Sequence, residues 1–252
     1  MTGVGVLGDV HGTTQAVISA IARTSKAGGD TVYQLGDFGI WPGVKGERFI
    51  DQVSAFAVER DVTVRFVDGN HENFDLLYRH EVGGDGFREI RPNLFHIPRG
   101  HVWEHDGCWF AAMGGAVSVD KHYRREGLDW FRDEEVIDLD VDRLEDNMAV
   151  VNRKWVDVML SHDCPDWCPV PVLEDDPPTW IPKHTLRRAN AHRGMLADAE
   201  LRCWPRLILH GHYHCHYRAE DRTTRVVGFD RESTPGNFGL LDFDDLDVMV
   251  PE

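Results

Sequence analysis

The sequence contains no run of apolar residues that approaches about 18 in length, the shortest stretch commonly read as a membrane-spanning helix. Its first residues, Met-Thr-Gly-Val-Gly, also lack the basic segment and the long apolar segment of a secretory signal. Cysteine is scarce. The chain has 5, and Cys164 and Cys168 have no second close pair to complete a structural zinc site with them. We therefore expect a cytoplasmic protein with reduced thiols and no membrane partner.

Basic residues are scarce too, because 27 Lys and Arg stand against 43 Asp and Glu and give a net charge of -16. Such a surface repels a phosphate backbone, so the composition argues against binding of duplex nucleic acid. A chain this acidic that acts on phosphates needs local positive charge, which metal ions can supply. Hydrophobic residues make up 42% of the chain, which indicates a folded protein rather than a disordered one.

The first part of the chain alternates between apolar runs and segments with helical spacing. Apolar runs at residues 4–7, 31–35 and 62–67 predict strands, and residues 15–26 and 47–60 place apolar side chains on one face of a helix. This β-α-β-α-β order predicts parallel strands joined by helical crossovers.

Shorter elements are expected further along the chain, and no linker or internal repeat divides it. The predicted elements are strands at residues 94–97, 101–104, 109–112, 155–160 and 206–209, helices at 73–80, 130–148 and 183–201, a proline-rich loop at 164–182, and antiparallel hairpin strands at 223–229 and 238–243. We expect a single domain over residues 1–252.

Polar residues directly follow five of the apolar runs, at the points where the strands end. They are Asp9, His11, Asp37, Asn70, His71, His162, His212 and His214. Open α/β sheets bind ligands at the carboxyl ends of their strands, so these side chains converge if the strands pair side by side. Mixed nitrogen and oxygen donors suit Mn, Fe, Zn or Ni rather than Ca. Seven candidate ligands, all of these residues except His71, suit two ions that share a bridging carboxylate.

The order of these blocks resembles the calcineurin-like metallophosphoesterase superfamily. The matching blocks are Asp-x-His at 9–11, Gly-Asp at 36–37, Gly-Asn-His-Glu at 69–72, His162, and Gly-His-x-His at 211–214. The resemblance implies a metal-dependent phosphoric ester hydrolase with a four-layer α/β/β/α sandwich around two central mixed β-sheets. It also implies a ligand set: Asp9, His11, Asp37 and His214 for one metal, and Asp37, Asn70, His162 and His212 for the other, with Asp37 as the bridge.

The resemblance further implies a mechanism in which a hydroxide between the two ions attacks phosphorus and His71 gives a proton to the leaving oxygen. Manganese is the first choice of metal, with Fe, Zn or Ni as alternatives. Glu72 and Asp163 are candidates for orienting His71.

Residues 114–124 resemble a bacterial and phage-type branch of the superfamily, in which such a block borders the active site, so we expect an insertion at about 114–148 beside it. There Arg124, Lys121 and Arg125 are candidate substrate-binding residues, since arginine holds phosphate by paired hydrogen bonds.

The favoured substrate is a small phosphate ester, and in particular a phosphodiester such as a 2′,3′-cyclic nucleotide. Alternatives are a Ser/Thr-type protein phosphatase, a nuclease of the same superfamily, and a metal-binding scaffold without catalysis. The block after Gly36 lacks the second Asp and the Arg that the protein phosphatases carry there. The oligomeric state stays open.

Overall fold

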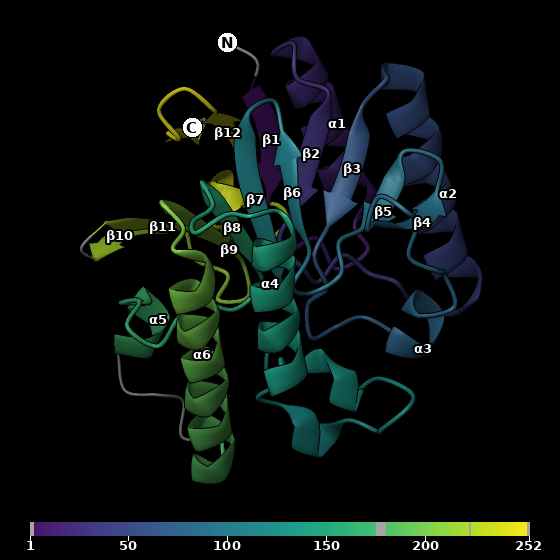
Figure 1. The fold of residues 1–252 in the computed structure, drawn as a ribbon. Coiled ribbons are helices and arrows are strands. Elements are labelled where there is room, and N and C mark those ends of the chain that lie inside the picture. Colours follow the sequence, from purple (N-terminus) through teal and green to yellow (C-terminus); the bar gives the residue numbers. More distant parts are fainter. Residues whose placement is uncertain (1–2, 175–179, 222, 251–252) are drawn as a thin grey trace.

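The computed structural model describes residues 3–174, 180–221 and 223–250, and it contains two β-sheets with helices outside them (Figure 1). The helices are α1 (Thr14–Lys26), α2 (Gly43–Arg60), α3 (Phe74–Leu77), α4 (Asp138–Val150), α5 (Pro171–Glu174) and α6 (Lys183–Cys203). Short 3-10 turns lie at Lys121–Tyr123, Arg132–Glu134 and Pro235–Asn237.

The first sheet has seven strands with a parallel centre. Its order is β13 (Val248–Met249), β12 (Phe238–Asp242), β1 (Gly3–Leu7), β2 (Thr31–Gln34), β3 (Thr63–Phe66), β5 (Leu94–His96) and β4 (Arg88–Arg91). The run β1-β2-β3-β5 is parallel, as the alternating pattern predicts, whereas β12 pairs antiparallel with β1.

The second sheet has six strands and is also mixed. Its order is β10 (Tyr217–Asp221), β11 (Thr224–Gly228), β9 (Leu207–His210), β8 (Val158–Ser161), β7 (Cys108–Met113) and β6 (Val102–His105). The four central strands are parallel, and the outer two pair antiparallel with their neighbours.

Three buried clusters of apolar side chains separate four layers. One lies between the first sheet and helices α1 and α2, and it includes Val17 and Val64. The second lies between the two sheets, where the Tyr33 and Phe110 ring centroids are 5.0 Å apart. The third lies between the second sheet and helices α4 and α6, and it includes Leu196. The predicted α/β/β/α sandwich is therefore confirmed.

The helix predicted over residues 130–148 begins later than expected, at Asp138. Residue Phe131 is extended, with φ -134°, and it packs into the core instead of continuing a helix. The Asp140 carboxylate accepts a hydrogen bond from the Ile137 N–H at 3.1 Å and caps the helix there. Other boundaries differ as well: α2 begins at Gly43, and α3 is one turn long.

The two segments predicted as a hairpin, residues 223–229 and 238–243, belong to different sheets. Strand β11 pairs with β10 and β9, while β12 pairs with β1 and β13. The tail therefore contributes a strand to each sheet and ties the two sheets together. The loop predicted at 164–182 contains α5, and its residues 175–179 lie outside the described residues.

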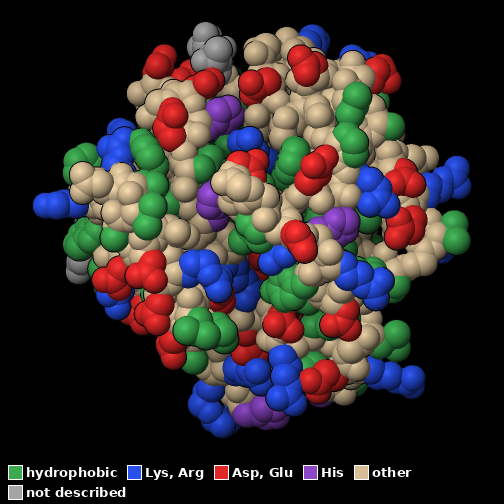
Figure 2. Space-filling view, turned by 45° about the vertical axis from the view of Figure 1, so that its right-hand side comes forward, with side chains coloured by type: hydrophobic (Ala, Val, Ile, Leu, Met, Phe, Trp, Pro, Cys, Tyr) green, Lys and Arg blue, Asp and Glu red, His purple; other side chains and the backbone are tan. Residues whose placement is uncertain are grey.

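No helix among the described residues is long and apolar enough to cross a membrane. All five cysteines are free. One face of the molecule carries acidic and basic side chains interspersed, so the net charge of -16 does not exclude local positive charge (Figure 2).

Candidate active site

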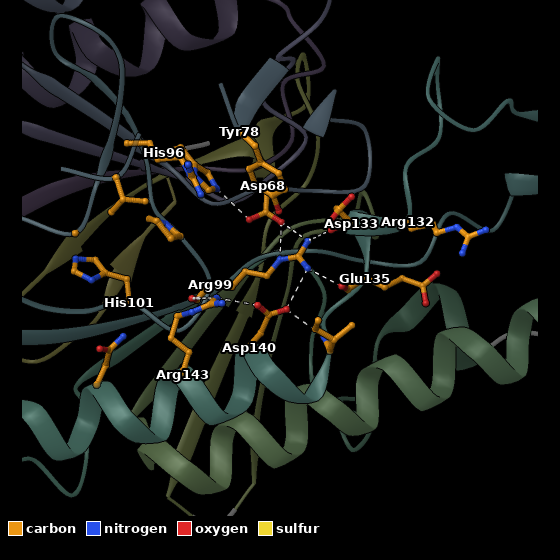
Figure 3. A pocket seen from close by; sticks show the side chains of 16 residues that line it. Asp68, Tyr78, His96, Arg99, His101, Arg132, Asp133, Glu135, Asp140 and Arg143 are labelled. Atoms are coloured by element: carbon orange, nitrogen blue, oxygen red, sulfur yellow. Dashed lines mark hydrogen bonds and ion pairs between the residues drawn. The ribbon is translucent and has the colours of Figure 1, made fainter. Parts of the chain in front are cut away.

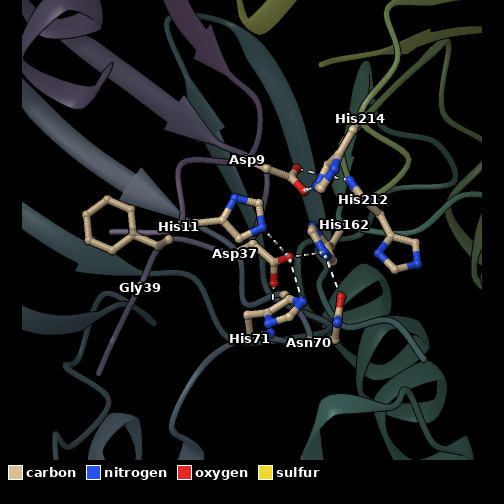
Figure 4. Close-up of polar contacts among 12 residues, drawn as sticks. Asp9, His11, Asp37, Gly39, Asn70, His71, His162, His212 and His214 are labelled. Carbon is tan, nitrogen blue, oxygen red and sulfur yellow. Dashed lines mark hydrogen bonds and ion pairs between the residues drawn. The ribbon is translucent and has the colours of Figure 1, made fainter. Parts of the chain in front are cut away.

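The polar turns after β1, β2, β3, β8 and β9 meet at one edge of the sandwich (Figure 4). Four of the side chains there stand on left-handed backbone, which is uncommon for residues other than glycine. Their φ angles are 43° at His11, 54° at Asp37, 70° at His212 and 49° at His214. Each such residue costs about 1–3 kcal/mol, and strain of this kind collects at functional sites. The turns therefore hold these side chains in positions that relaxed loops would not favour.

The Asp37 carboxylate lies at the centre of the cluster. Its Oδ2 atom is 3.4 Å from Nε2 of His11, 3.4 Å from Nε2 of His162 and 3.9 Å from Nε2 of His71. Its Oδ1 atom accepts a hydrogen bond from the His71 N–H at 2.8 Å. One carboxylate thus faces three imidazoles that arrive from three different turns.

Asp9 lies on the other side of His11. Its Oδ1 accepts a hydrogen bond from the His212 N–H at 3.0 Å. Its Oδ2 is buried and 3.0 Å from Nε2 of His214, yet it has no hydrogen-bond partner among the described residues. An anionic oxygen that is buried in this way favours a cation beside it. This orphaned atom is the first sign that the cluster fits metal ions.

Donor atoms group closely enough to share ions. The sets Asp9–His11–His214, Asp9–Asp37–His162 and His11–Asp37–His71 each bring three donor atoms within 4.8 Å of one another. Asp9 and Asp37 are each shared between two of these sets. A mixture of carboxylate oxygens and imidazole nitrogens suits transition metals, so the residues present fit the metal centre expected from the sequence.

The carboxylates of Asp37 and Asp9 lie directly against the backbone of two glycines, Gly69 and Gly211. A Cβ atom at Gly69 would lie 2.2 Å from Oδ1 of Asp37, and one at Gly211 would lie 2.2 Å from Oδ1 of Asp9. Only glycine leaves room for each carboxylate, which explains why these two motif positions carry it.

His162 is oriented by a backbone carbonyl. Its Nδ1–H donates to the Leu35 carbonyl oxygen at 2.6 Å, which leaves Nε2 directed at Asp37 and, at 3.2 Å, at Oδ1 of Asn70. This is the arrangement by which proteins present one ring nitrogen to a metal. Asn70 is held in turn, because its amide donates to the Ser118 hydroxyl at 3.1 Å.

His212 lies at the edge of the cluster. Its ring centroid is 5.1 Å from that of His162, and it belongs to none of the three close sets of donor atoms. The structure thus brings five of the seven predicted ligands into the close sets, together with His71, and Asn70 and His212 lie beside them; the five are Asp9, His11, Asp37, His162 and His214. The assignment of each as a ligand stays a prediction.

The carboxylates hold protons on two of the histidines. Burial alone would lower the pKa of His11, but the hydrogen bond and charge of Asp37, with help from Glu232, raise it to about 9. Burial would likewise lower the pKa of His162, but the charges of Asp37 and Asp9 raise it to about 10. In the metal-free chain, the negative charge of the carboxylates therefore keeps these two imidazoles protonated, and the same negative charge favours metal ions.

The His71 ring makes its closest side-chain contacts with Arg124, while the Asp37 carboxylate lies further away, 3.9 Å from its Nε2. The Arg124 Nη1 and Nη2 atoms lie 2.9 Å and 3.1 Å from the two ring nitrogens. Asp120 holds the guanidinium, with Oδ1 2.8 Å from Nε and Oδ2 2.8 Å from Nη2. Burial lowers the pKa of His71, and Arg124 and His11 add to that effect while Asp37 opposes it.

Neither sequence candidate for orienting His71 does so. The Glu72 carboxylate accepts hydrogen bonds from the backbone N–H groups of residues 38 and 39, at 2.8 and 3.0 Å, so it ties two loops of the site together. Asp163 accepts from His192 at 2.9 Å and from the Tyr213 hydroxyl at 2.6 Å. Those two suggestions from the sequence were wrong, because both carboxylates are engaged elsewhere.

Three basic residues are candidates for binding the substrate. Among the contacts of the described residues, only Arg124 reaches the metal cluster, through His71. Lys121 places its Nζ 3.5 Å from the centre of the Trp130 ring, a cation–π contact away from the metal cluster. The Arg125 side chain is exposed. Substrate binding by all three stays a prediction.

Sequence reasoning missed Glu232 and Asp120. The Nδ1 of His11 donates to Oε2 of Glu232 at 3.0 Å, across 221 residues of chain. The Glu232 N–H also donates to the Asp9 carbonyl at 2.8 Å. Glu232 follows two charged residues and Asp120 follows a short run that forms no strand, so the strand-end signal could not find them.

A four-layer sandwich with a shared-carboxylate cluster of nitrogen and oxygen donors at one edge is the architecture of a metal-dependent phosphoester hydrolase. Comparison with models of protein families matches residues 3–216 to the calcineurin-like phosphoesterases. The chain belongs to this family, which confirms the resemblance and the enzyme class, and the family uses a dinuclear divalent metal site.

Solved structures share the fold. The protein TT1561 of Thermus thermophilus has a TM-score of 0.59 at 14% identity, covering 98% of this chain and 97% of that one. A dimetal phosphatase from Danio rerio has a TM-score of 0.56 at 15% identity, covering 95% and 91%. GAP50, an anchor in the inner membrane complex of Plasmodium, has a TM-score of 0.50 at 10% identity, covering 95% and 81%. These likenesses establish the fold alone. A search of curated proteins found no significant match.

Proposed function

We propose that this chain hydrolyses small phosphate diesters of the nucleotide type, such as 2′,3′-cyclic nucleotides, at a centre of two metal ions. The observation that carries the proposal is the Asp37 carboxylate, whose Oδ2 lies 3.4 Å from Nε2 of both His11 and His162. A carboxylate between two sets of donors is what a pair of ions roughly 3.5–4 Å apart requires in general.

In this proposal the first ion is held by Asp9, His11, Asp37 and His214, and the second by Asp37, Asn70, His162 and His212. Support for the first set comes from the 3.0 Å approach of His214 to the orphaned oxygen of Asp9. Support for the second comes from the 3.2 Å approach of Asn70 Oδ1 to His162 Nε2. Manganese is our first choice for reconstitution, and Fe, Zn and Ni suit the same donors.

Bound ions would lower the pKa of water toward neutrality and offset charge on the phosphoryl oxygens. His71 would hold the proton that the leaving oxygen needs. Its Nε2 is 3.9 Å from Asp37, so the ring stands beside the proposed metals, and its exposure of 29% leaves a side open to substrate.

Arg124 is the proposed anchor for the phosphate. Asp120 already fixes its guanidinium, and a phosphate beside His71 would offer it oxygens in place of the imidazole. This role supports the view of residues 114–148 as an insertion that borders the site of a single domain.

A cavity of about 280 Å³ lies beside His71 and offers space for a flat group of the substrate. Trp41, Leu128 and Phe131 form an apolar part of its wall, and Arg124 and Asp129 lie at its polar part. The volume is close to the lower end of the range of ligand pockets, about 300–1,000 Å³. The Trp41 indole N–H donates to the His71 carbonyl at 2.7 Å, so the ring is held beside the proposed acid. An aromatic face held in this way can stack on a base.

The test is a hydrolysis screen of the Mn-loaded chain with bis-aryl phosphate, mono-aryl phosphate, 2′,3′-cyclic nucleotides and a phosphopeptide. We expect the diesters to be hydrolysed faster than the monoester, and chelation to abolish the activity. Hydrolysis of the phosphopeptide alone would favour a protein phosphatase instead. No hydrolysis of any of these esters would favour a non-catalytic scaffold.

Two variants test the assigned roles. His71→Ala should lower kcat by about 10²- to 10⁴-fold with metal content unchanged, and the loss should shrink for esters with acidic leaving groups. Arg124→Ala should raise KM by about 10- to 100-fold, since it removes hydrogen bonds to a charged group. Arg79→Ala is the matched control, because that side chain is exposed and does not line the cavity beside His71. A loss in kcat alone for Arg124→Ala would assign the arginine to positioning His71.

A further inference from the structure

A second cavity, of about 810 Å³, lies outside the metal cluster (Figure 3). Arginines and histidines, among them Arg88, His96, Arg99, His101 and Arg143, line it together with four carboxylates. None of the proposed metal ligands lines it. The cavity is therefore a separate feature, and the proposed function does not use it.

Three of the four carboxylates that line the cavity, those of Asp68, Glu135 and Asp140, have cationic or imidazole partners. Oδ2 of Asp68 accepts from Nε and Nη2 of Arg99 at 2.8 and 2.5 Å, and its Oδ1 lies 3.1 Å from Nε2 of His96. Asp140 accepts from Nη1 of Arg143 at 3.0 Å. Glu135 accepts from Nε of Arg188 at 2.7 Å, so the exposed Asp133 is the lining carboxylate for which the described residues offer no ion pair.

Donor groups, by contrast, remain unused. Buried Nε of Arg88, a donor, and Nε2 of His101, a donor or an acceptor according to the tautomer, have no hydrogen-bond partner among the described residues. Arg88 uses Nη1 on the His80 carbonyl, at 2.5 Å, and its guanidinium carbon lies 5.0 Å from the Tyr78 ring centre. The Arg143 side chain is 51% exposed, and in the described contacts it uses Nη1 alone. Buried donors without partners are costly, and a bound acceptor would relieve that cost.

One buried acceptor is also open. His96 is 2% exposed and its Nε2 lies 3.1 Å from Oδ1 of Asp68, an arrangement that favours the proton on Nε2 and a lone pair on Nδ1. That Nδ1 has no partner among the described residues. Tyr78, Val82 and Ile137 add apolar surface to the wall. The complementary ligand has an oxyanion, a hydroxyl or amino group, and some apolar surface.

We propose that this cavity binds the oxyanion of a small metabolite, a phosphate or a carboxylate, through Arg88 and Arg143. The volume falls within the general range of ligand pockets, about 300–1,000 Å³, and admits a molecule as large as a nucleotide. Asp68, which holds Arg99 in the wall, immediately precedes Gly69, Asn70 and His71 in the chain. Asp68 would therefore connect the ligand in this cavity to the proposed catalytic loop, since it lines the cavity and is the residue before that loop.

The test is titration calorimetry of the metal-loaded full chain with three probes: inorganic phosphate, adenosine 5′-monophosphate and malate. The variant Arg88→Ala/Arg143→Ala is compared with Arg79→Ala, an exposed arginine that does not line the cavity. We expect at least one probe to bind the double variant about 10- to 100-fold more weakly than the control, as loss of hydrogen bonds to an anion implies. The probe that loses affinity distinguishes a phosphate ligand from a carboxylate ligand.

Equal binding of all three probes by the double variant and the control would overturn the proposal, as would no binding to the wild-type chain. Arg88→Gln is close in size and serves if the double variant unfolds; it should weaken the same probe. Phosphate bound at the metal centre instead would be lost on chelation and kept by the double variant. Failure of the cavity and failure of the proposed metal centre are thus distinguishable.

Discussion

Replacement of Asp68 by Asn should destabilise the fold strongly, because this carboxylate neutralises a buried arginine. Asp68 is 1% exposed and Arg99 is 7% exposed. Two hydrogen bonds, at 2.8 and 2.5 Å, join the carboxylate to the guanidinium. Asn keeps the shape but removes the charge and one acceptor, so Arg99 would stay buried without its closer counter-ion and with Asp140 3.5 Å from its Nη1. Breaking a buried pair in this way costs about 3–5 kcal/mol in the free energy of unfolding.

The pH dependence of this contribution has a definite sign. Burial would raise the pKa of Asp68, but Arg99 and His96 outweigh burial and hold it well below its usual range. The stabilisation is therefore complete above the unfolded pKa of about 3.9, and it is lost as the pH falls toward the lower folded value. The difference between wild type and Asp68→Asn should accordingly shrink in acid.

Urea-induced unfolding at pH 7 measures the difference directly. Asp146→Asn on α4 is the control, since Asp146 is exposed, and it should change the unfolding free energy by less than about 0.5 kcal/mol. Removing both charges, with Asp68→Asn and Arg99→Met, should recover part of the loss. A value for Asp68→Asn that equals the control would refute the view that this ion pair supports the loop before Gly69.

Two further predictions concern the metal cluster. Because the pKa values of His11 and His162 are raised to about 9 and 10, their stabilisation of the metal-free fold is complete below about pH 6.5 and lost as the pH rises through those values. Metal binding at pH 7 should displace about two protons, measurable by calorimetry in buffers of different protonation enthalpy, and its absence would contradict the ligand roles. Glu232→Ala removes the partner of His11 Nδ1 and should weaken metal binding by about 10- to 100-fold without unfolding the chain, whereas unchanged affinity would show that Glu232 does not support His11.

The sequence predicted the parts of the site that local patterns encode. Asp9, Asp37 and Asn70 each follow an apolar run, and parallel pairing of β1, β2 and β3 then brings those turns to one edge. Parallel strands that pair side by side end at the same edge of the sheet, so the polar turns after them converge without any specific contact between distant residues. The central strands and the layered fold were predictable for the same reason.

The rest depends on contacts between distant segments. Glu232 reaches His11 across 221 residues, and Arg124 reaches His71 across 53, without a sequence spacing that marks either pair. Strand β4 was missed because Arg88-Glu-Ile-Arg91 is largely polar, lies at the edge of its sheet, and pairs with β5 in an irregular register. Edge strands of this kind carry little of the apolar alternation that predicts a strand.

The central claim is that Asp37 bridges two metal ions. It is tested most directly by metal analysis of the Mn-saturated chain, with Asp37→Asn alongside the wild type. The account predicts about two ions per wild-type chain and at most one in the variant, because the shared carboxylate serves both sets of donors. A single ion in the wild type, or two ions retained by Asp37→Asn, would contradict it.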